Sequence, residues 1–157
     1  MVTIEYDTTG AYVDDCLAVA RGLDRGFNDA GLASMAEDLP EQRQFLAFAD
    51  GELLGFVSID DSGPAVAEVA WFAVRSDSQG AGIGSRLLEA VTDRLAAGGV
   101  RLLSVKTLAA TVDDDHYARV RSFYEGAGFH HVETIDPYPE WEPGNPCAIY
   151  VKPLAAE

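Results

Sequence analysis

The run AVAEVAWFAVRSDSQGAGIGSRLLEAVTDRLAA, from Ala65 to Ala97, decides the fold. It opens with a nearly all-apolar segment ending at Val74, which is typical of a strand buried on both faces. It then passes through the glycine-rich turn Gln79–Gly84 and continues with apolar residues every four positions, as on one face of a helix. A strand that leads through such a turn into a helix predicts an anion site. The first-turn N–H groups of a helix have no partner, and the helix dipole favours negative charge.

Three kinds of phosphate-binding turn follow this plan. A P-loop requires Gly-Lys-Ser/Thr, whereas Gly84 is followed by Ser85-Arg86. A dinucleotide fingerprint requires Gly or Ala where Ser85 stands, and an acidic residue ending a strand about twenty residues later, which is not evident. The pattern Gln/Arg-x-x-Gly-x-Gly/Ala is met by Gln79, Gly82 and Gly84. It resembles the pyrophosphate-binding signature of the GNAT acetyltransferase superfamily, with an ordinary glycine-rich turn as the alternative.

The rest of the chain predicts strands and helices in a definite order. Asp50-Gly51 between two apolar runs indicates a hairpin with a type I′ turn. The strand expected at 101–108 should lie parallel to the strand ending at Val74, because a helix separates them. Further strands are expected at 3–6, 45–49, 53–59, from Phe129, and at 147–151, and further helices at 11–23, about 32–39 and 116–127. The order is β-α-α-β-β-β-α-β-α-β-β, a mixed sheet with helices packed against it.

A second motif supports the same resemblance. Phe123-Tyr124-Glu125-x-x-Gly128-Phe129 matches the late signature of the GNAT family, a helix bearing a tyrosine four residues before Gly-Phe. With the turn and the order of elements, the likeness covers nearly all of the chain, taken as one domain, 1–157. It implies an α/β (α+β) fold with a mixed, mostly antiparallel sheet of six to seven strands and about four helices. Two central parallel strands would splay apart around the pantetheine arm of acetyl-CoA.

The resemblance also implies an activity and a set of cofactor contacts. It implies an acetyl-CoA-dependent N-acetyltransferase, which needs no metal and acts on a primary amine of a small molecule or peptide by direct attack in a ternary complex. A non-catalytic acyl-CoA-binding regulatory module of the same fold is the alternative. One departure concerns Tyr117, which stands where many relatives have an asparagine that contacts the cofactor. The residues expected at the cofactor are Phe72, Ala73, Val74, Gln79, Gly80, Ala81, Gly82, Ile83, Gly84, Ser85 and Tyr117.

Two residues are candidates for proton transfer. Tyr124 is the candidate general acid, because the family places this tyrosine beside the cofactor sulfur; a core tyrosine is the alternative. Glu68 is the candidate general base, because it is the only charged residue between Ala65 and Val74 and several relatives use a strand glutamate near this place. The alternative for Glu68 is a carboxylate on a solvated face of the strand.

The acceptor pocket is expected between two irregular segments, since binding residues tend to lie on such stretches. One is the interruption at Phe27-Asn28 between the first two helices. The other is the proline-rich loop Tyr138–Pro146, with Trp141 as the expected aromatic contact.

The charge of the chain bounds its partners. There are 26 acidic and 11 basic residues, a net charge of −15, and only two lysines. This charge argues against nucleic acid as a partner, because phosphates would be repelled. The acidic surface either gathers cationic substrates or is a solvated coat like that of proteins from salt-loving organisms. The spread of the acids along the chain favours the coat.

No apolar run approaches membrane-spanning length, and the N-terminus has no basic-then-apolar signal. A cytoplasmic protein is therefore expected, with no membrane partner and with a homodimer left open. Cys16 and Cys147 have no metal-ligand spacing and are expected to be buried thiols.

Overall fold

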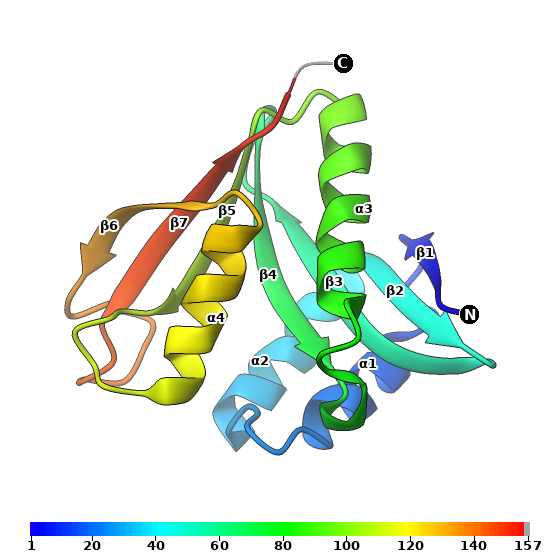
Figure 1. Ribbon diagram of the computed structural model, residues 1–157, viewed down its shortest axis with the longest axis horizontal. Helices are drawn as coiled ribbons and strands as arrows, with labels where there is room; N and C mark the ends of the chain where they lie inside the picture. Colours follow the sequence, from blue (N-terminus) through cyan, green and yellow to red (C-terminus); the bar gives the residue numbers. More distant parts are fainter. Residues whose placement is uncertain (156–157) are drawn as a thin grey trace.

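The computed structural model describes residues 1–155 and has the predicted order of elements (Figure 1). The elements are β1 (Thr3–Asp7), α1 (Val13–Arg21), α2 (Asp29–Asp38), β2 (Arg43–Ala49), β3 (Glu52–Asp61), β4 (Val66–Val74), α3 (Ile83–Ala97), β5 (Leu102–Leu108), α4 (Asp115–Gly126), β6 (His130–Ile135) and β7 (Cys147–Pro153). Single turns of 3-10 helix lie at Leu39–Glu41 and Ser76–Ser78.

The strands form one seven-stranded mixed sheet in the order β1-β2-β3-β4-β5-β7-β6. β4 and β5 are parallel, and the other neighbouring strands are antiparallel. Asp50 and Gly51 join β2 to β3 with φ of 51° and 78°, as a type I′ turn requires at both central positions. The predicted α+β class, hairpin and central parallel pair are therefore confirmed.

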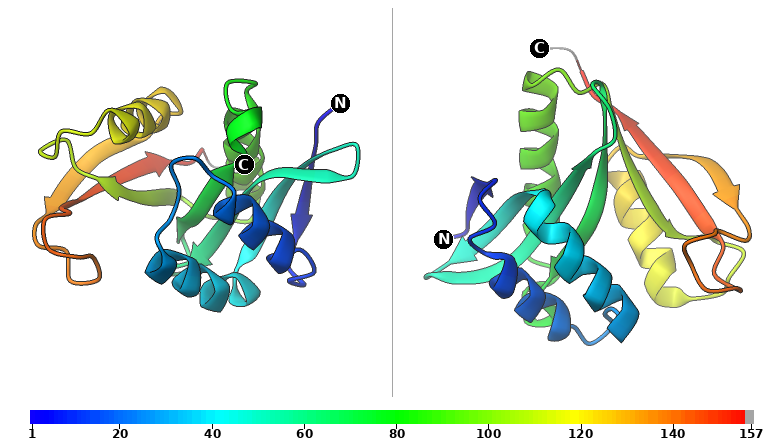
Figure 2. Two further views of the ribbon diagram at one scale, coloured as in Figure 1. Left: turned by 90° about the horizontal axis from the view of Figure 1, so that it is seen from below. Right: turned by 180° about the vertical axis from the view of Figure 1, so that it is seen from behind.

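Helices cover the two faces of the sheet in pairs (Figure 2). α1 and α2 lie on one face, and α3 and α4 lie on the other. A larger apolar core forms under α3 and α4, and a smaller one under α1 and α2. Because side chains alternate along a strand, each residue of β4 and β5 belongs to one of these two faces.

The first predicted helix is shorter than the apolar periodicity suggested. α1 covers Val13–Arg21 rather than 11–23, because Tyr12 is its N-cap and Gly22 is its C-cap.

Both cysteines, Cys16 and Cys147, are buried free thiols, as predicted.

Candidate functional site

The two parallel strands separate partway along the sheet. β4 pairs with β5 over four residue pairs, ending at Val69 opposite Val105, although both strands continue further. Ala70 is skipped in the pairing of β3 with β4, so β4 bulges at the same place. Beyond this splay point the two strands diverge toward the bottom of Figure 1. The predicted splay is present, and past Val69 the edge of β4 that faces β5 has no ladder partner within residues 1–155.

The N-terminus of α3, next to the end of β4, has no side-chain cap. Its N-cap residue is Gly82, and its first turn contains no acidic residue. By contrast, Asn28 and Asp114 cap α2 and α4, and each of those helices has an aspartate in its first turn. The amide of Arg86 makes the first bond of α3, to the carbonyl of Gly82, so the amides of residues 83–85 have no acceptor within the helix. This helix start suits an anion.

The turn before α3 keeps its backbone open. Gly80 and Gly82 have φ of 85° and 80°, and a side chain built on either would meet nothing within 4 Å. Ala81 and Ser85 are exposed in the same turn. The side chain of Gln79 points back toward the end of β4, where its Nε2 donates a hydrogen bond to the carbonyl of Val74 at 2.9 Å. Gln79 therefore closes the turn with its side chain, and the glycines leave the space above it free.

Gly84 has a different reason to be glycine. A Cβ here would lie 3.3 Å from the ring of Phe123 and 3.4 Å from that of Phe72. The absent side chain thus lets α3 pack against α4 and β4, in addition to the ligand approach that the motif suggested. Phe72 and Phe123 are themselves in edge contact, with ring centroids 5.9 Å apart.

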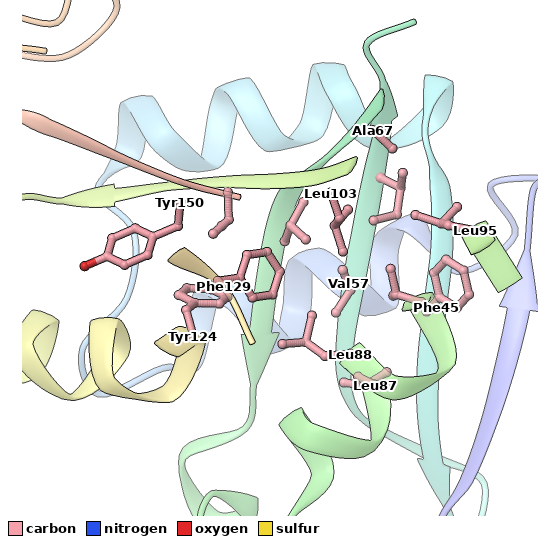
Figure 3. Packing of buried hydrophobic residues seen from close by; sticks show 14 of the residues in the cluster. Phe45, Val57, Ala67, Leu87, Leu88, Leu95, Leu103, Tyr124, Phe129 and Tyr150 are labelled. Atoms are coloured by element: carbon pink, nitrogen blue, oxygen red, sulfur yellow. The ribbon is translucent and has the colours of Figure 1, made fainter. Parts of the chain in front are cut away.

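Tyr124 is buried among these rings, with 6% of its surface exposed. Its ring centroid lies 6.3 Å from that of Phe72. It lies 5.4 Å from the ring centroid of Phe129, beside which it is seen in Figure 3. Its hydroxyl has no hydrogen-bond partner among residues 1–155. Burial raises the pKa of Tyr124 well above its ordinary value, so the phenol stays protonated and can act as a donor.

Tyr117 lies in the first turn of α4. Its amide donates to Asp114 Oδ1 at 3.1 Å, and its ring contacts that of His116. The side chain is partly exposed.

Glu68 does not stand alone on its strand. Lys106 Nζ lies 2.6 Å from Glu68 Oε2 and joins β5 to β4 at the splay point. Burial opposes the charge of Lys106, but the hydrogen bond and the charge of Glu68 outweigh it and raise the pKa of this lysine. Sequence reasoning missed Lys106, because the two residues are 38 positions apart and meet only through the β4–β5 register.

The Phe27-Asn28 segment contacts β4 through an aromatic pair. Phe27 and Trp71 have ring centroids 5.5 Å apart, and Trp71 Nε1 donates to Asp38 Oδ2 at 3.0 Å. Asn28 caps α2, because its Oδ1 accepts a hydrogen bond from the backbone N–H of Gly31 at 2.8 Å. The ring of Phe27 is thus placed near β4, while the amide side chain of Asn28 is engaged in the helix.

The loop between β6 and β7 lies next to the Glu68–Lys106 ion pair. Lys106 Nζ lies 5.8 Å from the centroid of the Tyr138 ring, and Trp141 packs against that ring at 5.2 Å. This loop lies on the same side of the sheet as α1 and α2 (Figure 2, left).

The predicted site residues thus divide between the two faces of the sheet. Phe72, Tyr124 and the start of α3 belong to the face of α3 and α4. Trp71 and Ala73 pack against α1 and α2. Glu68 lies on that side too, because its neighbours Ala67 and Val69 belong to the core under α3 and α4, and the bulge at Ala70 shifts the alternation between Glu68 and Trp71. We refer to the unpaired stretch of β4 and β5, past Val69 and Val105, as the gap.

A broad hollow of about 820 Å³ lies elsewhere, between α1, the start of β3 at Gly51–Leu53 and the turn Arg75–Asp77. It contains none of the predicted site residues. Among residues 1–155, no helix is both long and apolar enough to cross a bilayer.

Comparison with known proteins identifies the family. Residues 14–129 match the sequence model of the Acetyltransferase (GNAT) family. No curated protein matches the chain.

Solved structures resemble the chain over almost its whole length. A protein from Desulfovibrio desulfuricans assigned to the GNAT acetyltransferases has a TM-score of 0.86 at 21% identity, covering 99% of this chain and 100% of that one. The ribosomal-protein-S18-alanine N-acetyltransferase of Escherichia coli has a TM-score of 0.79 at 21% identity, covering 100% and 96%. A GNAT acetyltransferase from Elizabethkingia anophelis with acetyl-CoA bound has a TM-score of 0.73 at 22% identity, covering 98% of each chain. At these identities the likeness shows the fold.

Proposed function

The chain belongs to the GNAT acetyltransferase family, which uses acetyl-CoA as donor, and from this premise we propose that it acetylates a primary amine of a small molecule or peptide by direct attack in a ternary complex. The observation that carries the proposal is the start of α3. It is uncapped and free of acid in a chain of net charge −15, and it lies beside the gap between β4 and β5. A pyrophosphate fits there, because amides and dipole both favour an anion.

The cofactor would lie with its phosphates over Gln79–Ser85 and its arm in the gap. Gly80 and Gly82 leave the turn open where the phosphates must approach the backbone. The free edge of β4 past Val69 offers N–H groups to the arm and to the thioester carbonyl. Tyr117 would contribute at the start of α4 in place of the usual asparagine.

The reaction needs two proton transfers. An amine with a pKa near 10 is neutral in about one molecule in a thousand at pH 7, a handicap of roughly 4 kcal/mol. Glu68 takes the first proton of the ammonium, directly or through a water, and the amine attacks the carbonyl carbon. The carbon–sulfur bond breaks, the thiolate takes the proton of Tyr124, and the second amine proton restores Tyr124. Glu68 then releases its proton to solvent, which balances the step.

The acceptor would bind on the face of α1 and α2. Phe27, which packs on Trp71 of β4, and Trp141, which packs on Tyr138 beside Lys106, would contribute aromatic walls. A peptide N-terminus belongs among the candidates, because the E. coli neighbour is named for an alanine of a ribosomal protein.

Release of free coenzyme A thiol from acetyl-CoA tests the proposal. The panel comprises polyamines, amino acids, aminoglycosides and peptide N-termini, with the acetylated product identified by mass. A non-catalytic acyl-CoA-binding module would bind acetyl-CoA and release no thiol with any acceptor. That outcome would contradict the proposed acetyl transfer and favour the binding module.

A further inference from the structure

The ion pair between Glu68 and Lys106 lies where the acceptor must approach. Glu68 is the last residue but one of the β4–β5 pairing, and Lys106 follows Val105, the final paired residue of β5. Because Val69 and Val105 pack into the core under α3 and α4, their neighbours Glu68 and Lys106 face the opposite side. The side chains are 17% and 31% exposed, so a ligand on that side can reach both.

Both members of the pair keep unused bonding capacity. An ammonium has three donors, and Lys106 uses one on Glu68 Oε2 while its charge faces the Tyr138 ring. Glu68 Oε1 accepts no hydrogen bond from residues 1–155. A single, partly exposed ion pair contributes modestly to stability, so stability alone is a weak reason to place a lysine here in a chain that has only two.

The surroundings of the pair are aromatic and acidic. The Tyr138 ring lies beside Lys106 and packs on Trp141, while Trp71, with Asp38 hydrogen-bonded to its indole, lies further along β4 on the same face. The carboxylates of Glu68 and Asp38 on this face favour the ammonium of an acceptor. A molecule with cationic groups alone would also bring positive charge against Lys106, which costs binding.

Resting on the proposed function, we propose that the acceptor is an amine bearing a carboxylate on the neighbouring carbon, such as a free α-amino acid, with its carboxylate held by Lys106 and its ammonium by Glu68. The two charges of such a molecule match the two charges of the pair. Holding the carboxylate also fixes the position of the nitrogen, which is a large part of the rate in bimolecular transfer.

Matched acceptors test this specificity. Each α-amino acid is compared with its own amide, which keeps the amine and the side chain but lacks the carboxylate. A charge-assisted hydrogen bond predicts a preference for the acid of about 10- to 100-fold in kcat/KM. K106M should abolish the preference, chiefly through a higher KM for the acid, while K106R should retain most of it. K152M, which changes the chain's other lysine, should leave the preference unchanged.

Equilibrium binding of acid and amide to the protein loaded with coenzyme A gives a readout that does not depend on turnover. Tighter binding of the acid that K106M abolishes supports the inference. Thiol release with amides or plain polyamines as good as with amino acids overturns the inference and leaves the proposed acetyl transfer standing. Absence of thiol release with every acceptor, with acetyl-CoA still bound, counts against acetyl transfer itself. Equal binding of acid and amide overturns the inference in either case.

Discussion

Arg25 and Asp114, 89 positions apart in the chain, form an ion pair with Nη2 3.1 Å from Oδ2. Arg25 belongs to the loop between α1 and α2, and Asp114 is the N-cap of α4. The pair therefore ties the two halves of the molecule together at the end where β4 and β5 have diverged (Figure 1). The arginine side chain is 57% exposed and that of the aspartate 25%.

Replacing Arg25 by Gln should loosen this end of the gap. The pair is exposed, so the loss of folding stability should stay within about 1 kcal/mol. The dissociation rate of acetyl-CoA should rise by up to about fivefold, measured by stopped flow. High salt should bring the wild type toward the variant, because exposed charges are screened. Arg21→Gln, on α1, is the control of equal charge, and an equal change in that variant would contradict the role of the pair.

Gly82→Val should separate ligand binding from backbone strain. Gly82 has φ of 80° with open space around its Cβ, and Gly99, after the other end of α3, has φ of 95° with open space as well. Both valine variants should lose about 1–2 kcal/mol of folding stability to the left-handed backbone. Only Gly82→Val should also weaken acetyl-CoA binding, by tenfold or more in calorimetry. Equal acetyl-CoA affinities for the two variants would contradict the proposal that the phosphates bind at this turn.

Tyr124→Phe should slow turnover by about 10²- to 10⁴-fold if its phenol protonates the departing thiolate. Because burial raises the pKa of Tyr124, the phenol stays protonated across the working range, and raising the pH should not restore the rate. The pH–rate profile is the measurement, with acetyl-CoA affinity determined separately. Tyr150→Phe is the matched control, a buried tyrosine that bonds Glu125 instead. A Tyr124→Phe protein that loses stability but not turnover would make Tyr124 a packing residue.

Glu68→Gln should lower the rate most near neutral pH. The loss should shrink as pH rises, because more of the acceptor then arrives without its proton. Asp60→Asn serves as control, since Asp60 lies opposite Glu68 on β3. If Glu68→Gln has the wild-type rate at neutral pH, Glu68 is not the general base, and its role is the structural ion pair with Lys106.

The same variant makes a separate prediction about stability. Glu68 raises the pKa of Lys106 in the folded protein, so the pair stabilises the fold below the ordinary lysine pKa and stops doing so as pH rises through the raised value. The difference in unfolding free energy between wild type and Glu68→Gln should therefore be present at pH 7–9 and fall in strongly alkaline solution. Urea titrations across this range measure it, and a difference independent of pH would contradict the pairing.

The order of elements could be predicted because each signal is local. The Asp50-Gly51 hairpin and the strand, turn and helix around Gln79 are written in neighbouring residues, and a helix between two strands makes them parallel. Lys106 beside Glu68 could not be predicted, because the contact depends on the register of strands far apart in the chain. The packing of Gly84 against Phe123 depends in the same way on how two helices meet.

The four residue pairs between β4 and β5 have a consequence for how the protein opens. The neighbouring antiparallel pairings, β3 with β4 and β5 with β7, cover seven pairs each, so the sheet is most weakly joined at its middle. Strands β1–β4 and strands β5–β7 with α4 are thus poised to behave as two cooperative units that can part along this seam. In amide exchange, the seam should open at lower free energy than either unit unfolds. A ligand that lies in the gap contacts both units. It would therefore slow their separation and stabilise the folded protein.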